Sequence, residues 1–112
     1  FEEGYQATKE YLAMGQDLGS AIVAAADDIA IGCIKALREH GIRVPQDISI
    51  VSIDNDACSS FVQPPLTTIN IPIVAITERA MEVAKLLIED GTVPIPEVIK
   101  GNLIIRESAI PI

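Results

Sequence analysis

Residues 20–55 of this chain read SAIVAAADDIAIGCIKALREHGIRVPQDISIVSIDN, and this stretch decides the fold. The apolar run at 20–25 does not alternate with polar residues, which is typical of a strand covered on both faces in a parallel sheet. A helix over 27–38 follows, which starts at an acidic pair able to cap it and ends before Gly41. A second apolar run at 48–53 leads into turn residues. The stretch therefore predicts a strand, a helix and a second strand in succession.

Further elements precede and follow this unit. The spacing of apolar residues predicts helices at 5–14 and 73–90, a third strand at 66–71, a stiff connector at 92–96, and a last strand over 98–100 and 103–105 that is interrupted between its two halves. The order α-β-α-β-β-α-β with short connections indicates an α/β layered fold with a mainly parallel sheet.

The composition excludes several classes of protein. Of the 112 residues, 49% are hydrophobic and 21% are charged, which allows a buried core and excludes a disordered segment. Sixteen Asp and Glu against eight Lys and Arg give a net charge of −8, so the surface repels nucleic-acid phosphates. No apolar run approaches the roughly 20 residues of a membrane-spanning helix. Two cysteines, Cys33 and Cys58, without metal-binding spacing favour a reducing, cytoplasmic compartment.

Acidic residues follow the first two predicted strands. Asp27 and Asp28 come after the first strand, and Asp54 and Asn55 come after the second. Because parallel strands end at the same edge of a sheet, both turns are predicted to lie together, where their carboxylates could bind the hydroxyl groups of a polyol. The same residues could instead cap a helix and turn the chain, and the sequence leaves both interpretations open.

A third interpretation concerns the run Asp54-Asn55-Asp56. An Asp-x-Asp pattern after an apolar strand also occurs in Mg²⁺-dependent phosphotransferases, with one Asp as nucleophile and the other as acid and base. That chemistry needs a Lys or Arg and another acidic ligand at later strand ends, for which the sequence offers no clear candidates. A phosphotransferase stays an alternative. With no Ser-His or Cys-His pair and no phosphate-binding glycine loop, no enzyme activity, metal or cofactor is predicted.

Apolar residues that the core does not require point to an association surface. In the helix over 27–38, one face can pack on the sheet, which leaves Ile31 and Ile34 facing outward. Phe61 and Val62, just before two prolines, would enlarge this apolar surface if they lie nearby. Such patches mark sites of association, although another part of a longer chain could cover the same surface. The start at Phe1 without an initiator Met suggests such a longer chain.

Four motifs together resemble one known family. They are AAADDIAIG at 24–32, ALREHGIRVPQDISIVSIDN at 36–55, PPLTTI at 64–69 and IRES at 105–108. In this order they resemble the effector-binding domain of the lactose/galactose repressor family, over a span from about Gly4 to Ser108. Periplasmic sugar-binding proteins share the fold, but the second and third motifs look like those of the repressors.

The resemblance implies an incomplete type I periplasmic-binding-protein-like fold with a three-layer parallel sheet. Residues of about 4–70 and 98–112 would form most of the C-terminal lobe, and those of about 73–94 would belong to the N-terminal lobe. The chain would cross between the lobes near 70–72 and near 94–98.

The resemblance also implies a site for a sugar or other small metabolite between the two lobes. The aspartate of the family's Gly-aromatic-Asp turn matches Asp54, which would accept hydrogen bonds from effector hydroxyl groups. Asp27 is a second candidate for effector binding, and Phe1 is a candidate for the aromatic residue that stacks on the effector. Three positions depart from the family's pattern: Ala26 replaces an Asn that can touch the effector, Ser52 replaces the usual Gly, and Ile53 replaces the usual aromatic residue.

By the same resemblance, the chain is expected to sense an effector in a bacterial DNA-binding transcriptional regulator that is cytoplasmic, homodimeric and free of membrane contacts. Operator DNA would be bound by a helix-turn-helix headpiece outside this chain. Family dimers pair through one helix and one loop, which here carry Ile31, Ile34, Cys58, Phe61 and Val62. A periplasmic sugar-binding protein remains the main alternative to a regulator.

Overall fold

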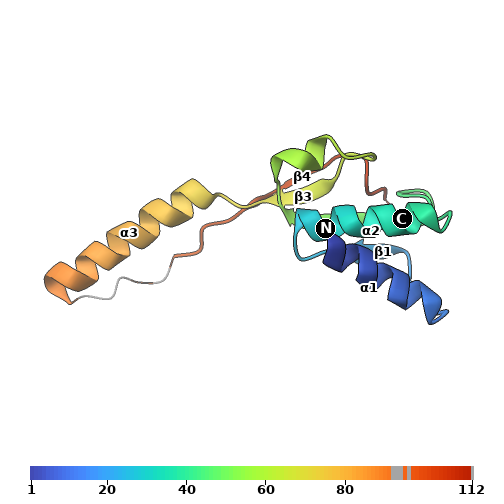
Figure 1. Cartoon of the computed structure of the whole chain (residues 1–112). Helices are drawn as coiled ribbons and strands as arrows, with labels where there is room; N and C mark the ends of the chain where they lie inside the picture. Colours follow the sequence, from blue (N-terminus) through green and yellow to red (C-terminus); the bar gives the residue numbers. More distant parts are fainter. Residues whose placement is uncertain (92–94, 96, 112) are drawn as a thin grey trace. The chain divides into compact units, whose positions relative to one another are not determined.

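The structure is a computed structural model that describes residues 1–91, 95 and 97–111 (Figure 1). Its elements are α1 (Glu2–Ala13), β1 (Ala21–Val23), α2 (Asp27–Glu39), β2 (Ser49–Asp54), the 3₁₀ helix η1 (Ala57–Ser60), β3 (Thr67–Asn70), α3 (Ile73–Asp90) and β4 (Asn102–Ile104). The predicted α/β fold is confirmed. The chain divides into two compact units, which are described separately: unit 1 comprises Phe1–Asn70 and Leu103–Ile112, and unit 2 comprises Ile71–Asn102.

The sheet has the strand order β1-β2-β3-β4. Strand β1 pairs with β2 in parallel, and β2 pairs with β3 in parallel, as the sequence predicts. The register places Val23 opposite Val51 and Asp54 opposite Asn70. The carboxyl ends of these three strands therefore lie along one edge of the sheet, which is where open α/β sheets bind ligands.

The prediction that the first strand is covered on both faces is wrong for the described residues. Ala21 and Val23 are exposed, Val23 to 76%, whereas Ile22 between them is half-buried. Neighbouring side chains of a strand point to opposite faces, so one face of β1 is covered and the other faces solvent. Strand β1 stands at the end of the strand order, so it has a neighbouring strand on one side only.

The core of unit 1 contains residues from α2 and from the strands. Leu37, Ile50 and Leu66 have no exposed surface. Fully burying one such side chain stabilises the fold by about 1.5–3 kcal/mol. The buried hydrophobic cluster consists of Ala24, Ala30, Cys33, Ile34, Leu37, Ile48, Ile50 and Leu66. Since α2 connects β1 to β2, this core fixes the first turn of α2 against the carboxyl-end edge of the sheet.

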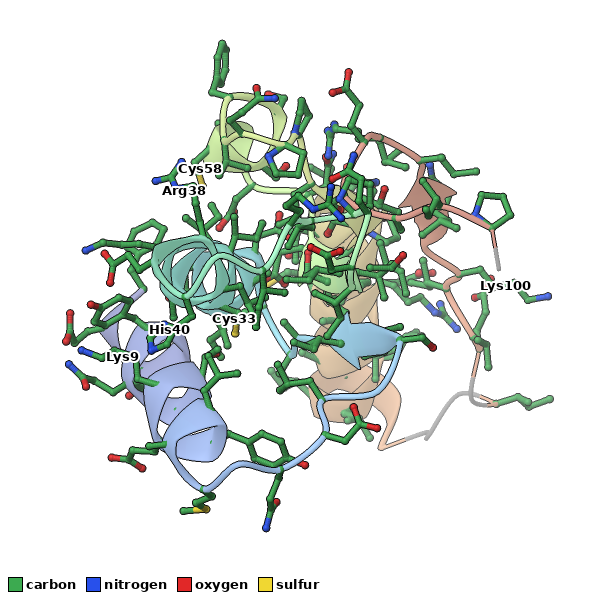
Figure 2. All side chains as sticks on the ribbon, turned by 90° about the vertical axis from the view of Figure 1, so that its right-hand side faces the viewer. Lys9, Cys33, Arg38, His40, Cys58 and Lys100 are labelled. Carbon is green, nitrogen blue, oxygen red and sulfur yellow. The ribbon has the colours of Figure 1, made fainter. Side chains whose placement is uncertain are left out.

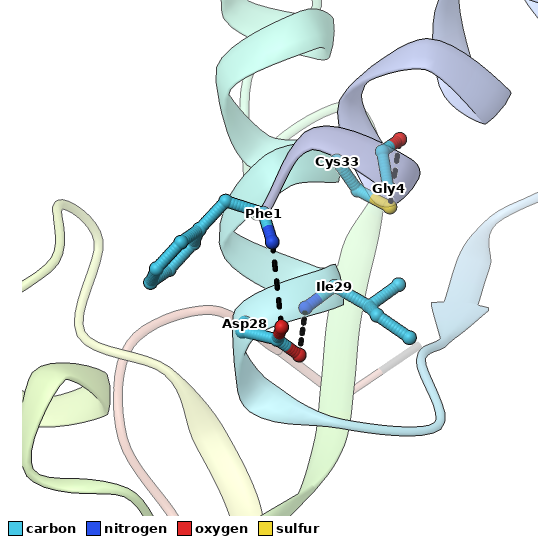
Figure 3. Close-up of polar contacts among 5 residues, drawn as sticks. All are labelled: Phe1, Gly4, Asp28, Ile29 and Cys33. Carbon is cyan, nitrogen blue, oxygen red and sulfur yellow. Dashed lines mark hydrogen bonds and ion pairs between the residues drawn. The ribbon is translucent and has the colours of Figure 1, made fainter.

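Helices α1 and α2 approach each other closely because two glycines lie between them. A Cβ atom added to Gly4 would overlap the carbonyl oxygen of Ile29, and one added to Gly32 would overlap that of Phe1. The Sγ atom of Cys33 lies 3.6 Å from the carbonyl oxygen of Gly4 (Figure 3). Any side chain at either glycine would force the helices apart, so the close contact depends on these two residues.

The last residues of the chain return to unit 1 and tie its strands together. The buried Ser108 hydroxyl donates to the carbonyl of Ile50 on β2 over 2.6 Å and accepts from the N–H of Thr67 on β3 over 2.8 Å. The carbonyl of Ser108 also accepts from the N–H of Ile50 over 2.7 Å. The IRES motif at 105–108 thus holds the amino-terminal parts of two neighbouring strands.

Unit 2 consists mainly of α3, which confirms the helix predicted at 73–90. The helix ends at Gly91, whose φ of 62° is the left-handed conformation that glycine adopts easily. Arg79 forms ion pairs with Glu82 at 2.7 Å and with Glu97 at 3.4 Å. The strand predicted at 98–100 is wrong, because only Asn102–Ile104 forms β4. Most of the connector predicted at 92–96, and residues 94 and 96 of the second predicted crossing, lie outside the described residues.

Candidate functional site

The strand ends bring the two aspartate-bearing turns together, as the sequence predicts. Asp27 begins α2 just after β1, and Asp56 lies just after β2. The backbone N–H of Asp56 donates to Asp27 Oδ2 over 2.7 Å. This edge of unit 1 is therefore a single cluster of polar groups rather than two separate turns.

Asp27 is fully buried, and both of its carboxylate oxygens accept hydrogen bonds. Its Oδ1 atom accepts from the hydroxyl of Thr68 over 2.6 Å and from the hydroxyl of Ser52. Ser52 and Thr68 are register partners on β2 and β3, so one carboxylate spans both strands and the turn. The N-cap residue of α2 is Ala26, so the alternative in which Asp27 caps the helix is wrong.

Asp54, the last residue of β2, has a positive φ of 121°, and Asn55 after it has a φ of 59°. Such backbone is rare for L-residues other than glycine, and strained residues of this kind gather at ligand sites. Burial raises the pKa of the Asp54 carboxyl, and the charges of Asp27 and Asp56 raise it further, while a hydrogen bond from the Asp27 backbone lowers it. Because an ionised carboxylate offers about four acceptor positions, it can still accept hydrogen bonds from a ligand.

A second network of hydrogen bonds centres on Arg106 and reaches the turn at Asn55. Arg106 was not identified as a site residue from the sequence. Its guanidinium donates to Asn55 Oδ1 over 2.7 Å, to the carbonyl of Leu66 over 2.7 Å and to Ser59 Oγ over 3.1 Å. Its backbone N–H donates to Thr67 Oγ1 over 2.9 Å. The signal available in the sequence was the IRES motif, in which Arg106 is the only basic residue.

Phe1 lies at the α1 end of unit 1 and is 58% exposed. Its backbone nitrogen lies 3.3 Å from Oδ2 of Asp28, in the first turn of α2. Figure 3 shows this contact, with the aromatic ring of Phe1 extending away from it. With Ile31 and Lys35, Phe1 lines a cavity of about 250 Å³ on the α1–α2 pair. The ring thus faces solvent beside the start of α2, and its predicted contact with an effector stays a prediction.

The residues predicted to pair two subunits differ in exposure. Phe61 is 87% exposed, and Ile31, Cys58 and Val62 are half-buried. The prediction that Ile34 faces outward is wrong, because it is 3% exposed and belongs to the core. Ile34 is buried because α2 is covered on two faces, by α1 and by the sheet. Figure 2 labels Cys58 on η1 and Arg38 on α2, two elements that contact each other.

A cavity of about 630 Å³ lies in unit 1 between α2, the loop at 41–46 and the segments around Pro64 and Arg106. Asp54 is not among its lining residues, so the candidate site is an open edge and not this cavity. Within the described residues, no group of three or more His, Cys, Asp or Glu could hold a metal ion. No described helix is both long enough and apolar enough to cross a bilayer.

Comparison with known proteins identifies relatives of this chain. It matches the family described as periplasmic binding protein-like domain over residues 2–109. It is 37% identical over 109 residues to the HTH-type transcriptional regulator GanR of Bacillus subtilis, covering 96% of this chain and 33% of GanR. It is 34% identical over 91 residues to the HTH-type transcriptional regulator AscG of Escherichia coli, covering 81% of this chain and 27% of AscG. The chain spans about a third of the length of these curated relatives.

Solved structures agree with these relatives. The lac repressor dimer bound to operator and the anti-inducer ONPF is 30% identical, with a TM-score of 0.87 over 96% of this chain and 37% of that one. The complex of the transcriptional regulator CelR with cellobiose is 30% identical, with a TM-score of 0.80 over 94% of this chain and 32% of that one. The resemblance inferred from the four sequence motifs is confirmed by these matches.

Proposed function

Because the chain belongs to the family of periplasmic binding protein-like domains, we propose that it is the effector-sensing part of a bacterial transcriptional regulator of the lactose/galactose repressor type. The observation that carries this proposal is Asp54, a carboxylate that a left-handed turn presents at the ligand-binding edge of a parallel sheet. Relatives at 37% and 34% identity are both transcriptional regulators, which favours this role over transport or phosphotransfer.

The effector is a sugar or another small metabolite with hydroxyl groups. Asp54 accepts hydrogen bonds from these hydroxyl groups. Asp27 has both oxygens engaged inside the protein, so its role is to fix the turn that carries Asp54 and not to contact the effector. Phe1 is exposed beside the start of α2 and offers an apolar face for stacking. CelR, a similar structure, is a complex with cellobiose, which supports this ligand class.

The two units correspond to parts of two lobes. Unit 1 is most of the C-terminal lobe, and unit 2 is an element of the N-terminal lobe. The effector binds between the lobes, with Asp54 on the C-terminal side. An open edge such as this one gains a closed site only when a second wall is present, which supports a two-lobed arrangement.

The intact regulator works as a cytoplasmic homodimer without a cofactor or an enzymatic step. Half-buried Ile31, Cys58 and Val62 and exposed Phe61 pair two subunits. A helix-turn-helix headpiece outside this chain binds operator DNA, since a surface with a net charge of −8 repels phosphates. A lac repressor structure similar to this chain is a dimer bound to operator, which supports both points.

Effector binding changes operator binding only through a difference in affinity for two lobe arrangements. An effector that stabilises one arrangement shifts the dimer toward it, with a coupling free energy of about 1–3 kcal/mol between the two sites. Asp54 contributes to that difference when the effector contacts both lobes at once, because such contacts form fully in only one lobe arrangement.

The test is thermal unfolding and calorimetric titration of the intact protein with galactose, lactose, maltose and cellobiose. At least one sugar is expected to raise the unfolding midpoint of the wild type through binding linkage. Asp54→Asn is expected to lose about 10–100-fold in affinity for that sugar, because a hydrogen bond to a charged group is worth about 1.5–3 kcal/mol.

The matched control is Asp56→Asn. Asp56 is an exposed aspartate two positions after Asp54, so this variant removes one negative charge near the site without changing Asp54. It is expected to keep sugar affinity within about threefold, since exposed charges contribute little. Equal losses in both variants would assign the effect to net charge and remove Asp54 from the site. Sugar binding by an intact protein that has no affinity for DNA would favour a transport-type binding protein instead.

A further inference from the structure

The side chain of Asn55 joins two segments that are far apart in the sequence. Its Nδ2 atom donates to Asn70 Oδ1 over 3.0 Å, and its Oδ1 atom accepts from Arg106 Nη2 over 2.7 Å. A guanidinium can only donate hydrogen bonds, so the orientation of the Asn55 carboxamide is fixed. The backbone N–H of Asn55 also donates to Thr68 Oγ1 over 3.3 Å. The carboxamide is therefore a bridge with a partner at each end.

Both partners stand where the chain passes between its two units. Asn70 is the last residue of β3 and the last of unit 1 before the chain continues into Ile71–Asn102. Arg106 follows β4 and lies a few residues after the chain returns to unit 1 at Leu103. One side chain thus contacts the segment that leaves unit 1 and the segment that re-enters it.

The returning segment is held firmly at Arg106. Its guanidinium also donates to the carbonyl of Leu66 and to Ser59 Oγ, and its backbone N–H donates to Thr67 Oγ1. The Ser59 hydroxyl in turn donates to the carbonyl of Asp56 over 2.7 Å. Arg106 is therefore connected to the turn on both sides, through Asn55 directly and through Ser59 at Asp56.

We propose that Asn55 is a positioning residue that couples the effector-binding carboxylate of Asp54 to both chain crossings, through its bonds to Asn70 and Arg106. This inference rests on the proposed function of Asp54. Because Asp54 and Asn55 share one tight left-handed turn, a shift of either crossing changes the turn, and an effector held by Asp54 favours the crossing geometry that fits it. Asn suits this position because it tolerates positive φ and carries both a donor and an acceptor.

The test is hydrogen–deuterium exchange of the intact protein, wild type and Asn55→Gly. Glycine adopts a φ of 59° without strain, so this variant removes the bridge and leaves the turn backbone relaxed. Without any sugar, amides at 70–73 and at 101–106 are expected to exchange about five- to tenfold faster, while those in α1 and α2 keep their wild-type rates. Ser60→Gly is the matched control, since its hydroxyl makes only a local bond to Ala57.

A second variant keeps the inference testable if Asn55→Gly unfolds. Asn55→Asp keeps an oxygen acceptor for Arg106 and removes the Nδ2 donor to Asn70, so exchange is expected to rise at 70–73 and to stay near the wild-type rate at 101–106. Unchanged exchange at both crossings in Asn55→Gly would overturn the inference, and so would a uniform rise throughout unit 1, which marks a merely structural role.

The last arm adds cellobiose or whichever of the four sugars binds the wild type. Protection from exchange is expected at the turn and at both crossings in the wild type, but at the turn alone in Asn55→Gly, with sugar affinity lowered by about tenfold or less. Equal protection of the crossings in both proteins would overturn the coupling. If the wild type binds no sugar, the proposed function fails and the coupling fails with it, whereas the sugar-free exchange still reports on the bridge itself.

Discussion

The two aspartates that follow β1 and β2 look alike in the sequence, but their surroundings differ. Asp27 is fully buried, with two hydroxyl groups and one backbone N–H as partners. Asp54 is partly exposed, lies in left-handed backbone and has a raised pKa. The comparison teaches that an aspartate at the end of a parallel strand can either support a site or form it, and that its hydrogen-bond partners decide which.

The difference arises from where each residue stands relative to its strand. Asp54 is itself the last residue of β2, so its side chain remains at the edge of the sheet. Asp27 comes after a short connection and begins α2, whose packing on the core turns the carboxylate inward beneath the neighbouring turn. Asp27 therefore supports the turn that carries Asp54, because it accepts a hydrogen bond from the N–H of Asp56, two residues beyond Asp54.

The largest effect is expected for Asp27→Ala, measured by urea unfolding of the intact protein. The substitution leaves the buried hydroxyls of Ser52 and Thr68 and the partly buried N–H of Asp56 without their acceptor. Each unsatisfied buried group costs about 1–3 kcal/mol, so a loss of about 3 kcal/mol or more is expected. Asp28→Ala is the control and is expected to cost about 1 kcal/mol or less, because Asp28 is half-exposed. Equal losses would remove the distinction between supporting and surface carboxylates.

A smaller effect is expected for Thr68→Val, which keeps the shape of the side chain and removes its hydroxyl. Asp27 Oδ1 then loses one of two donors, and the N–H of Asn55 loses its acceptor. The free energy of unfolding is expected to fall by about 1–2 kcal/mol, again measured by urea unfolding. Thr68→Ser retains the hydroxyl, so it should keep both bonds and lose only the packing of one methyl group.

A double-mutant cycle would sharpen the same comparison. Ser52 and Thr68 donate to the same oxygen of Asp27, so their substitutions by Ala and Val should not add. Additive losses in Ser52→Ala and Thr68→Val would show that the two hydroxyls do not depend on a shared acceptor.

The sequence predicted the elements well but not the contacts behind the site. The β-α-β order, the parallel pairing and the meeting of the two turns followed from apolar runs and strand direction. The partners of Asp27 did not, because Ser52 and Thr68 lie within apolar strands and Thr68 is 41 positions away along the chain. Nor did Arg106, whose bond to Asn55 spans 51 positions. Such pairings depend on tertiary register, which local patterns do not contain.

The error at Ile34 has a similar cause. When a helix carries apolar residues on almost every side, their periodicity does not identify the buried face. The sequence alone therefore does not show which isoleucine packs inward. The structure buries Ala30, Ile34 and Leu37, spaced like successive turns of one face, and α1 covers Gly32 and Cys33 on another. The sequence near α2 did not indicate that both α1 and the sheet would cover this helix. The only local sign was the pair Gly4 and Gly32, which allow α1 to approach.

The smallest effect concerns the pH dependence of stability at Asp54. Burial, with the negative charges of Asp27 and Asp56, raises the pKa of Asp54 above its ordinary value. A carboxyl with a raised folded-state pKa binds its proton more tightly in the folded protein, so stability falls as the pH rises from the ordinary pKa through the raised one. Asp54→Asn removes this loss and is expected to stabilise the protein slightly at pH 7, by less than about 1 kcal/mol.

Asp47 supplies the control of opposite sign. Hydrogen bonds from Arg43 lower the pKa of Asp47 to about 2, so its contribution is present above the ordinary pKa and is lost as the pH falls toward that value. Thermal midpoints between pH 2 and pH 7 should therefore show the Asp54→Asn advantage growing with pH and the Asp47→Asn deficit growing with pH. Any benefit of Asn for the left-handed backbone is independent of pH and cancels in this comparison. If the difference in thermal midpoint between the wild type and Asp54→Asn does not change with pH, then ionisation of Asp54 does not destabilise the folded protein. The turn would then present the carboxylate without electrostatic strain.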